Sequence, residues 1–313
     1  TVSAKACARG IPMTTDAARR SLLSRLFAGT AGPVIVVVAL LMVVWYGAAV
    51  ALNAPFARQM APDPANFSTM DLLAATWSQE RPVLPAPHQV VVELKKTVFD
   101  IPVTSKRSLV QHGWVTLSST LVGFALGAIL GLLLAVAIVH VKALEKSLMF
   151  WIVSSQTVPI LAVAPIVIVV LGAMGITGLV PKAIISAYLC FFPVTIGMVK
   201  GLTSPDRLHL DLMRTWDATP AQTFWRLRVP ASVPFLFTSL EVAIAASLVG
   251  AIVGELPTGA QAGLGARLLA GSYYGQTIQI WAALFAAAFL AAAMVGLVGL
   301  VERLVLARMG GRR

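Results

Sequence analysis

The sequence predicts an all-α integral membrane protein with about six transmembrane helices. Two features of its 313 residues lead to this fold class: 58% are hydrophobic, and only 12% are charged. Soluble domains carry about a quarter charged residues, so this composition excludes an ordinary soluble domain. The net charge of +11 does not indicate nucleic acid, because basic loops on the cytoplasmic side explain it in a membrane protein. The chain is therefore expected to be surrounded by membrane lipid, which is its first expected partner.

Six hydrophobic runs are long enough to cross a bilayer, which takes roughly 20 apolar residues in a helix. The expected spans are 33–54, 114–139, 148–171, 179–199, 233–253 and 278–300. They imply a cytoplasmic segment at 1–32, a first helix at 33–54, an outer Pro-rich segment at 55–113, a core of five helices at 114–305 with an inner loop at 202–230, and a basic tail at 306–313. Residues 1–12, ahead of Met13, are interpreted as an unstructured leader or an upstream start.

The distribution of Lys and Arg predicts that both termini are cytoplasmic. The inner segments then hold 16 of these residues and the outer segments 7; the inner ones are 1–32, 140–147, 200–232 and 301–313, and the outer ones 55–113, 172–178 and 254–277. The long outer segment includes "HQVVVELKKTVFD", whose spacing predicts a helix. This segment is either a connector between spans or a contact for an external partner.

The second span carries a small-residue pattern, with Gly123, Gly127 and Gly131 at G-x-x-x-G spacing. Such spacing lets two helices approach closely. The contact lies either within one subunit or between two.

The inner loop 202–230 is polar and charged, although hydrophobic spans flank it. Its aspartates come early and its arginines late, an order that suits a helix dipole. Thr219 and Pro220 predict the N-cap and first residue of a second short helix. Trp216, Phe224 and Trp225 are large apolar groups outside the membrane, which is typical of an interface. The alternative is a loop folded back on its own spans.

This loop resembles the cytoplasmic coupling loop of binding-protein-dependent ABC importer permeases. That family has an acidic residue, two Ala, a Gly and then Leu-Pro. In this sequence Asp211 takes the acidic position, Leu212 and Met213 replace the Ala pair, Asp217 replaces the Gly, and Val229–Pro230 stands for Leu-Pro.

The longer stretch Gln156–Leu202 resembles the nitrate, sulfonate, taurine and thiamine-precursor branch of these type I permeases. The shared residues are Pro159, Pro165, Gly172, Gly175, Lys182, Phe192–Pro193 and Gly201. "GAIVGELPTGAQAGLG" and "LPAPHQVV" also resemble segments of that branch. The resemblance covers about residues 82–305 and is specific for the family, not for the substrate.

The resemblance implies a permease subunit, not an enzyme, of a bacterial-type inner membrane importer. A second permease copy or homologue would complete the channel, an extracytoplasmic binding protein would deliver the solute, and two ABC ATPase subunits would dock inside. The chain has no G-x-x-x-x-G-K-[ST] motif of its own, so ATP and Mg would bind the partner ATPase. The residues expected to couple to the ATPase are Asp211, Arg214, Trp216, Asp217, Phe224, Trp225, Arg226 and Pro230.

Polar residues within spans predict the solute path, because ionisable and polar groups there usually face protein or water. Ser155, Gln156 and Thr157 precede Pro159 and either line the path or bond back to their own helix. Glu255 is expected to act as a gate or to anchor the Gly-rich outer loop. Glu241 is expected to pair within the protein.

Three matters stay open in the sequence. A secondary transporter or channel is the alternative class, but it would lack a use for the aromatic inner loop. The solute is interpreted as a pyrimidine-like or other heterocyclic precursor, with sulfonate, taurine or nitrate as alternatives. The channel could be a homodimer or a heterodimer of permeases.

No metal-ligand spacing is visible among His, Cys, Asp and Glu.

Overall fold

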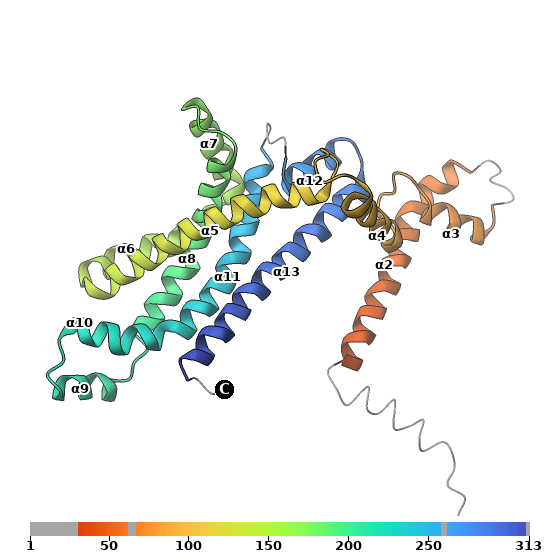
Figure 1. Ribbon diagram of the computed structural model, residues 1–313. Coiled ribbons are helices and arrows are strands. Elements are labelled where there is room, and N and C mark those ends of the chain that lie inside the picture. The colour runs from red at the N-terminus through yellow and green to blue at the C-terminus, as the bar shows by residue number, and fades with distance from the viewer. Residues whose placement is uncertain (1–30, 62–66, 258–261, 311–313) are drawn as a thin grey trace, which may run out of the picture. The chain divides into compact units, whose positions relative to one another are not determined.

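The structure is a computed structural model that describes residues 31–61, 67–257 and 262–310. Every regular element in these ranges is a helix, which confirms the expected all-α class (Figure 1). The chain divides into two compact units, Thr1–Pro87 and His88–Arg313. The proposed leader at 1–12 and nearly all of the expected cytoplasmic segment 1–32 lie outside the described residues.

The first unit consists of the long helix α2 (Ala31–Gln59), the short helix α3 (Thr69–Trp77) and the segment that follows α3. Asn53 of α2 is fully buried and holds that segment. Its amide nitrogen donates to the Leu84 carbonyl at 2.9 Å, and its oxygen accepts the N–H of Val83 at 2.8 Å. Trp45 donates its indole N–H to the carbonyl of Pro85 at 3.0 Å. A polar residue within a span is therefore satisfied by the backbone of the outer segment.

The second unit contains the remaining helices. They are α4 (Pro87–Lys95, which starts at the boundary between the units), η1 (Lys96–Asp100), α5 (Leu109–His140), α6 (Lys142–Ser155), α7 (Ile160–Ala173), α8 (Leu179–Leu202), α9 (Arg207–Thr215), α10 (Pro220–Thr223), η2 (Phe224–Arg228), α11 (Val229–Glu255), α12 (Leu264–Tyr273) and α13 (Thr277–Arg308). The expected helix within "HQVVVELKKTVFD" corresponds to α4 and η1.

The span expected at 148–171 is not one straight helix. It is formed by α6 and α7, which meet at an angle of 96° (Figure 1). Pro159 explains the break, because it has no N–H to continue the helix of α6 and restricts the residue before it; it becomes the N-cap of α7. In the described residues, five helices are long and apolar enough to cross a membrane, and the bent pair would make six.

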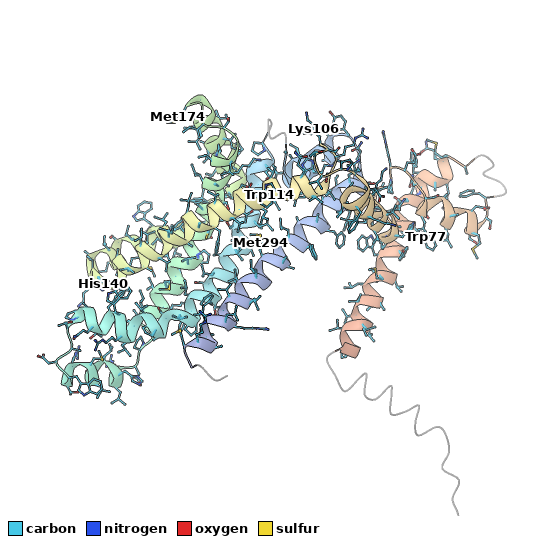
Figure 2. The ribbon with its side chains drawn as sticks, in the orientation of Figure 1. Trp77, Lys106, Trp114, His140, Met174 and Met294 are labelled. Atoms are coloured by element: carbon cyan, nitrogen blue, oxygen red, sulfur yellow. The ribbon has the colours of Figure 1, made fainter. Side chains whose placement is uncertain are left out.

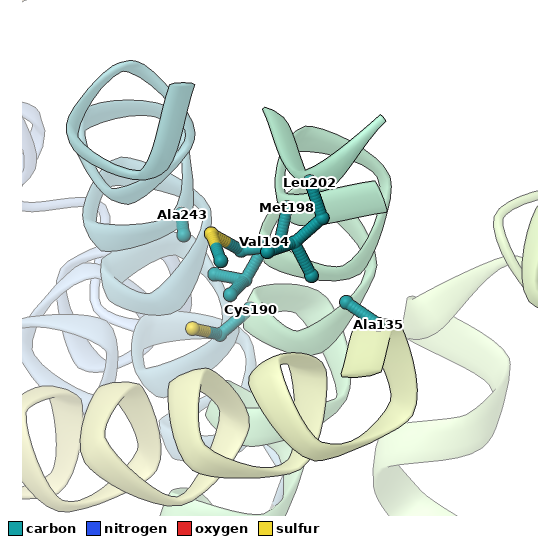
Figure 3. Packing of buried hydrophobic residues seen from close by; sticks show 6 residues of the cluster. All are labelled: Ala135, Cys190, Val194, Met198, Leu202 and Ala243. Carbon is teal, nitrogen blue, oxygen red and sulfur yellow. The ribbon is translucent and has the colours of Figure 1, made fainter. Parts of the chain in front are cut away.

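The core of the second unit is formed by α5, α8 and α11, which pack closely on one another. Figure 3 shows a cluster of buried apolar residues at their meeting point, among them Cys190, Val194 and Met198 of α8 and Ala243 of α11. Helix α13 packs on α11 and α12. Helices α9 and α10 of the inner loop lie at one end of this bundle and α12 at the other (Figure 1).

The glycines of α5 allow this packing, and the contact lies within one chain. A Cβ at Gly127 would lie 2.6 Å from the Cβ of Cys190, and one at Gly131 would lie 2.8 Å from the Cβ of Val194. A Cβ at Gly123 would overlap Ser186. The G-x-x-x-G pattern of α5 therefore faces α8.

We predict that Gly127→Ala weakens the core, because the added methyl group forces α5 and α8 apart. Overpacking of this kind costs about 1–3 kcal/mol. The measurement is the thermal unfolding midpoint of the full chain in lipid nanodiscs. Gly113→Ala is the matched control, because Gly113 is on the same helix and a Cβ there would meet nothing within 4 Å. Equal midpoints for the two variants would contradict the prediction.

Candidate functional site

The inner loop contains two short helices that meet at a sharp bend. Helix α9 ends at Thr215, and α10 starts with Thr219 as N-cap and Pro220 as its first residue. The Thr219 hydroxyl accepts the N–H of Gln222 at 3.3 Å, and the Gln222 side chain accepts the N–H of Thr219 at 2.9 Å. This reciprocal pair is a capping box. The expected second helix and its cap are confirmed.

Asp217 adopts a left-handed backbone conformation at this bend, with φ of 52°. Among non-glycine residues, Asp and Asn tolerate this region best. The family pattern quoted above has Gly at this position. The structure shows that Asp217 takes up the positive φ that a glycine would supply.

Helix α9 presents an apolar stripe that nothing in the described residues covers. Leu208, Leu212 and Trp216 follow one another at four-residue spacing, so they share one face of the helix. All three are exposed, Trp216 to 72%. Trp225 in η2 is exposed to 68%. Large exposed apolar side chains gathered on one surface mark an interaction site.

Phe224 lies differently from the two tryptophans, although the sequence grouped all three. It is half-buried and packs against the apolar cluster of α5, α8 and α11. Its ring meets the edge of His140, at the end of α5, with centroids 5.0 Å apart. Figure 2 labels His140 at that end of the helix. Phe224 therefore attaches the loop to the bundle, while Trp216 and Trp225 face outward.

The charged residues of the loop lie at its surface. Asp211 and Arg214 pair with each other at 2.9 Å, one turn apart on α9, with both side chains largely exposed. Exposed pairs of this kind add little stability. Arg226 is exposed in η2, and Pro230 is half-buried near the start of α11. The loop thus presents an apolar stripe with ionic groups beside it.

At the opposite end of the bundle, Glu255 is fully buried at the last residue of α11. Its carboxylate accepts the N–H of Gly265 at 2.9 Å and lies 3.0 Å from the Thr116 hydroxyl, which donates to it. The ammonium of Lys182 is 3.7 Å away and donates to the carbonyl of Ala262 at 3.1 Å. We call Glu255, Lys182, Thr116 and His112 the polar latch.

The polar latch holds the segment that leads into α12. The Thr116 hydroxyl accepts the N–H of Leu264 at 2.8 Å, and the Nδ1 atom of His112 accepts the N–H of Gly263 at 3.0 Å. Gly263 has φ of +128°, and a Cβ there would overlap the carboxylate of Glu255. Only glycine fits this position, so the segment and the buried carboxylate interlock.

The sequence singled out Glu255 and noted Lys182 but missed His112 and Thr116 as partners. These two residues are four positions apart, so they share one face of α5. Two buried polar residues at helical spacing near the end of a predicted span were the available signal. Their acceptor and donor partners come from 139 to 151 residues away and were not readable from the sequence.

The residues at the α6–α7 break bond back to their own backbone. Ser155 donates to the Ile152 carbonyl at 2.7 Å, and Thr157 donates to the Ser154 carbonyl at 2.7 Å. Gln156 is exposed. Back-bonding, one of the two interpretations of this polar run, therefore describes Ser155 and Thr157. These residues make no contact with the polar latch among the described interactions; the carbonyl of Ser155 instead accepts the Tyr188 hydroxyl of α8 at 2.6 Å.

Glu241 was expected to pair within the protein. In the part of the chain that the structure describes, it makes no ion pair or hydrogen bond, and its carboxylate faces Gly299 of α13. The expectation of an internal partner is not met there.

The fold and these two sites define a class: a multi-pass membrane protein with a buried polar latch at one end and a loop with exposed apolar side chains at the other. Residues 127–311 match the family of binding-protein-dependent transport system inner membrane components, and the chain belongs to this family. It is therefore a permease subunit of an ABC importer for small solutes, located in the inner membrane.

Several curated proteins are similar to the chain. The formylaminopyrimidine transport permease protein ThiX of Halalkalibacterium halodurans is 33% identical over 186 residues, which cover 58% of this chain and 68% of that protein. The riboflavin transport system permease protein RibX of Chloroflexus aurantiacus is 31% identical, covering 71% and 79%. The putative aliphatic sulfonates transport permease protein SsuC of Bacillus subtilis is 26% identical, covering 72% and 77%.

We predict that Thr116→Val loosens the polar latch, because it removes the hydroxyl that joins Glu255 to the N–H of Leu264. A lost buried hydrogen bond costs about 1–3 kcal/mol, and about 1.4 kcal/mol corresponds to a tenfold change. Amide hydrogen exchange in the peptide 263–268 should accelerate about tenfold.

Thr195→Val is the control for this change. Thr195 is also fully buried, but its hydroxyl donates only to the Phe191 carbonyl of its own helix, at 2.7 Å. Amide hydrogen exchange in the peptide 263–268 of the Thr195→Val variant should match that of the parent chain. If the two variants behaved alike, Thr116 would not hold this segment.

Proposed function

We propose that this permease is driven by separate ATPase subunits that dock on α9, α10 and η2 at its cytoplasmic face. One observation carries the proposal: the stripe of Leu208, Leu212 and Trp216 is exposed and lies in none of the candidate spans, and Trp225 of η2 is exposed as well. An ATPase groove that received this stripe would bury it. ATP and Mg would bind the ATPase, which supplies the energy, while this chain supplies the path.

The connection of the loop to the bundle supports a mechanical role. Helix α9 follows α8 after a short link, and η2 continues directly into α11. Both α8 and α11 belong to the closely packed core, so they would respond to a movement of the loop as rigid bodies. Closure of the ATPase pair would then tilt these helices and open the path alternately to each side.

The proposed assembly contains two permease subunits, either two copies or one copy and a homologue. An extracytoplasmic binding protein would deliver the solute to the end that carries the polar latch. This orientation places both termini in the cytoplasm, as the distribution of Lys and Arg favours. Glu255 would then act at the outer gate, by holding the segment before α12 in one position.

For the solute, we propose an uncharged heterocycle of the pyrimidine type. Its support is the similarity to a formylaminopyrimidine permease and a riboflavin permease, both of which are at least 31% identical to this chain. The alternatives are sulfonates and nitrate, since permeases with those printed solutes are also related, at 26% identity.

We predict that Trp216→Ala combined with Trp225→Ala prevents docking without unfolding the spans. Truncating a buried aromatic anchor costs about 2 kcal/mol or more at an interface. The measurement is the amount of ATPase that copurifies with the tagged permease from nanodiscs. Loss of a single anchor of this size already weakens binding by more than tenfold, so copurification should fall at least about tenfold.

Trp151→Ala is the control, because Trp151 is about equally exposed but belongs to α6, outside the inner loop. It should leave copurification unchanged. Phe224→Ala is a second comparison and should lower the thermal midpoint, because Phe224 packs on the bundle. If the double tryptophan variant retained ATPase at the parent level, this docking surface would be incorrect.

We also predict that Glu255→Gln permits assembly but shifts the balance between outward-open and inward-open states. The change removes the charge that Lys182 faces at 3.7 Å, while a side-chain oxygen remains for the N–H of Gly265. A shift of about 1.4 kcal/mol would change the ratio of the two states tenfold. ATPase stimulation by the loaded binding protein should change, with near-normal copurification of the ATPase.

Glu145→Gln is the matched control, because Glu145 is exposed on α6 and should leave stimulation unaltered. Unchanged stimulation and unchanged uptake by Glu255→Gln in reconstituted vesicles would refute a gating role. Failure of that variant to assemble would instead make Glu255 a folding residue.

A further inference from the structure

A cavity of about 740 Å³ opens between α5, α7 and α8, at the end of the bundle that carries the polar latch. Figure 2 labels two residues near this end, Trp114 on α5 and Met174 at the tip of α7. Small-molecule sites occupy about 300–1,000 Å³ and are mostly apolar with a few polar groups. The cavity meets both criteria, since Ile168, Val115 and Leu179 contribute apolar walls beside a few polar side chains.

The polar side chains that line the cavity offer both hydrogen-bond donors and hydrogen-bond acceptors. Lys182 is the single ionisable side chain among its described lining residues. The ammonium has three N–H donors, of which one bonds the Ala262 carbonyl and another can face Glu255. A donor therefore remains for a group in the cavity. Ser118 and Ser119 direct their own hydrogens to backbone carbonyls of α5, so their oxygens remain as acceptors.

The charge balance of the cavity favours an uncharged guest. The positive charge of Lys182 is already matched by the carboxylate of Glu255 at 3.7 Å. An anion that approached the ammonium would also approach this carboxylate, which would repel it. A neutral group such as a carbonyl or a ring nitrogen can accept the remaining N–H without that repulsion.

Trp114 supplies a flat surface at the edge of the cavity. It lines the cavity and is exposed to 69%, so a face of its indole is accessible. Aromatic rings stack on such a surface in offset or edge-on arrangements. The three elements together are a donor, two hydroxyl acceptors and a stacking surface.

We propose that this cavity is a transit site for the solute and that it selects an uncharged, planar heterocycle with both acceptor and donor groups. This assignment rests on the proposed transport function and adds a location and named residues to it. Trp114 stacks on the ring, Lys182 donates to an acceptor on it, and Ser118 accepts from a ring or exocyclic N–H.

The test is protection of an introduced thiol. Val115→Cys, at a lining position that makes no polar contact in the proposal, is placed in the full chain with Cys7→Ser, while Cys190 is buried and stays. The chain in nanodiscs is treated with a thiol reagent, with and without formylaminopyrimidine as the probe. At about four times the half-protecting concentration, the labelling rate should fall about fivefold by mass action. Thr104→Cys, at an exposed position outside the cavity, should show no protection.

Two tryptophan variants locate the probe. Trp114→Ala in the Val115→Cys chain should abolish protection at the same probe concentration, whereas Trp151→Ala should preserve it. If Val115→Cys lowers the thermal midpoint, Ile176→Cys replaces it, because Ile176 also lines the cavity.

Several outcomes would overturn the assignment. They are absence of protection, equal protection of Thr104→Cys, and protection that survives Trp114→Ala. Protection by an alkane sulfonate or nitrate but not by the heterocycle would overturn the solute class. Copurification of the ATPase is measured on the same samples. If ATPase binds but the thiol is not protected, the cavity assignment fails alone; if the thiol is protected but no ATPase binds, the cavity stands and the driving mechanism fails.

Discussion

The whole second unit depends on the close approach of helix backbones at positions without side chains. In hydrocarbon, helices gain no hydrophobic free energy by meeting, so van der Waals contact over short distances must hold them together. The glycines of α5 face α8, and Gly250 of α11 would place a Cβ 2.7 Å from the Cα of Ser186. Ser186 and Ser247 then bond across the same contact at 2.6 Å. These contacts hold α5, α8 and α11 together as a frame, and this frame positions the inner loop, the polar latch and the cavity.

Two helices of this frame connect the inner loop at one end to the polar latch at the other. Helix α8 carries Lys182 near its start and leads into α9, while α11 begins after η2 and ends at Glu255. At about 1.5 Å per residue, each is long enough to cross most of a bilayer. The two partners of the ion pair therefore belong to the two helices that flank the inner loop. A relative tilt of α8 and α11 would change the distance between ammonium and carboxylate directly.

The sequence predicted the parts of this structure that depend on local chemistry. Hydrophobic runs indicated the spans, Thr219–Pro220 indicated the cap of α10, and the glycine spacing of α5 indicated a tight helix contact. It did not show that Pro159 turns one expected span into two helices, because proline is also tolerated inside α7 and α8. Nor could it show that Phe224 turns inward while Trp216 and Trp225 face out, or that His112 and Thr116 reach the segment before α12. Those features depend on contacts between residues far apart in the chain.

The left-handed conformation of Asp217 has a consequence for how related permeases are recognised. The bend between α9 and α10 requires a backbone shape, and glycine is only one way to obtain it. An aspartate or asparagine can supply the same torsion angle at a modest energetic cost. A consensus that demands glycine at this position will overlook chains such as this one, whereas a pattern written in backbone angles would retain them. The amino-acid sequence of the loop can thus differ between permeases while its backbone geometry is preserved.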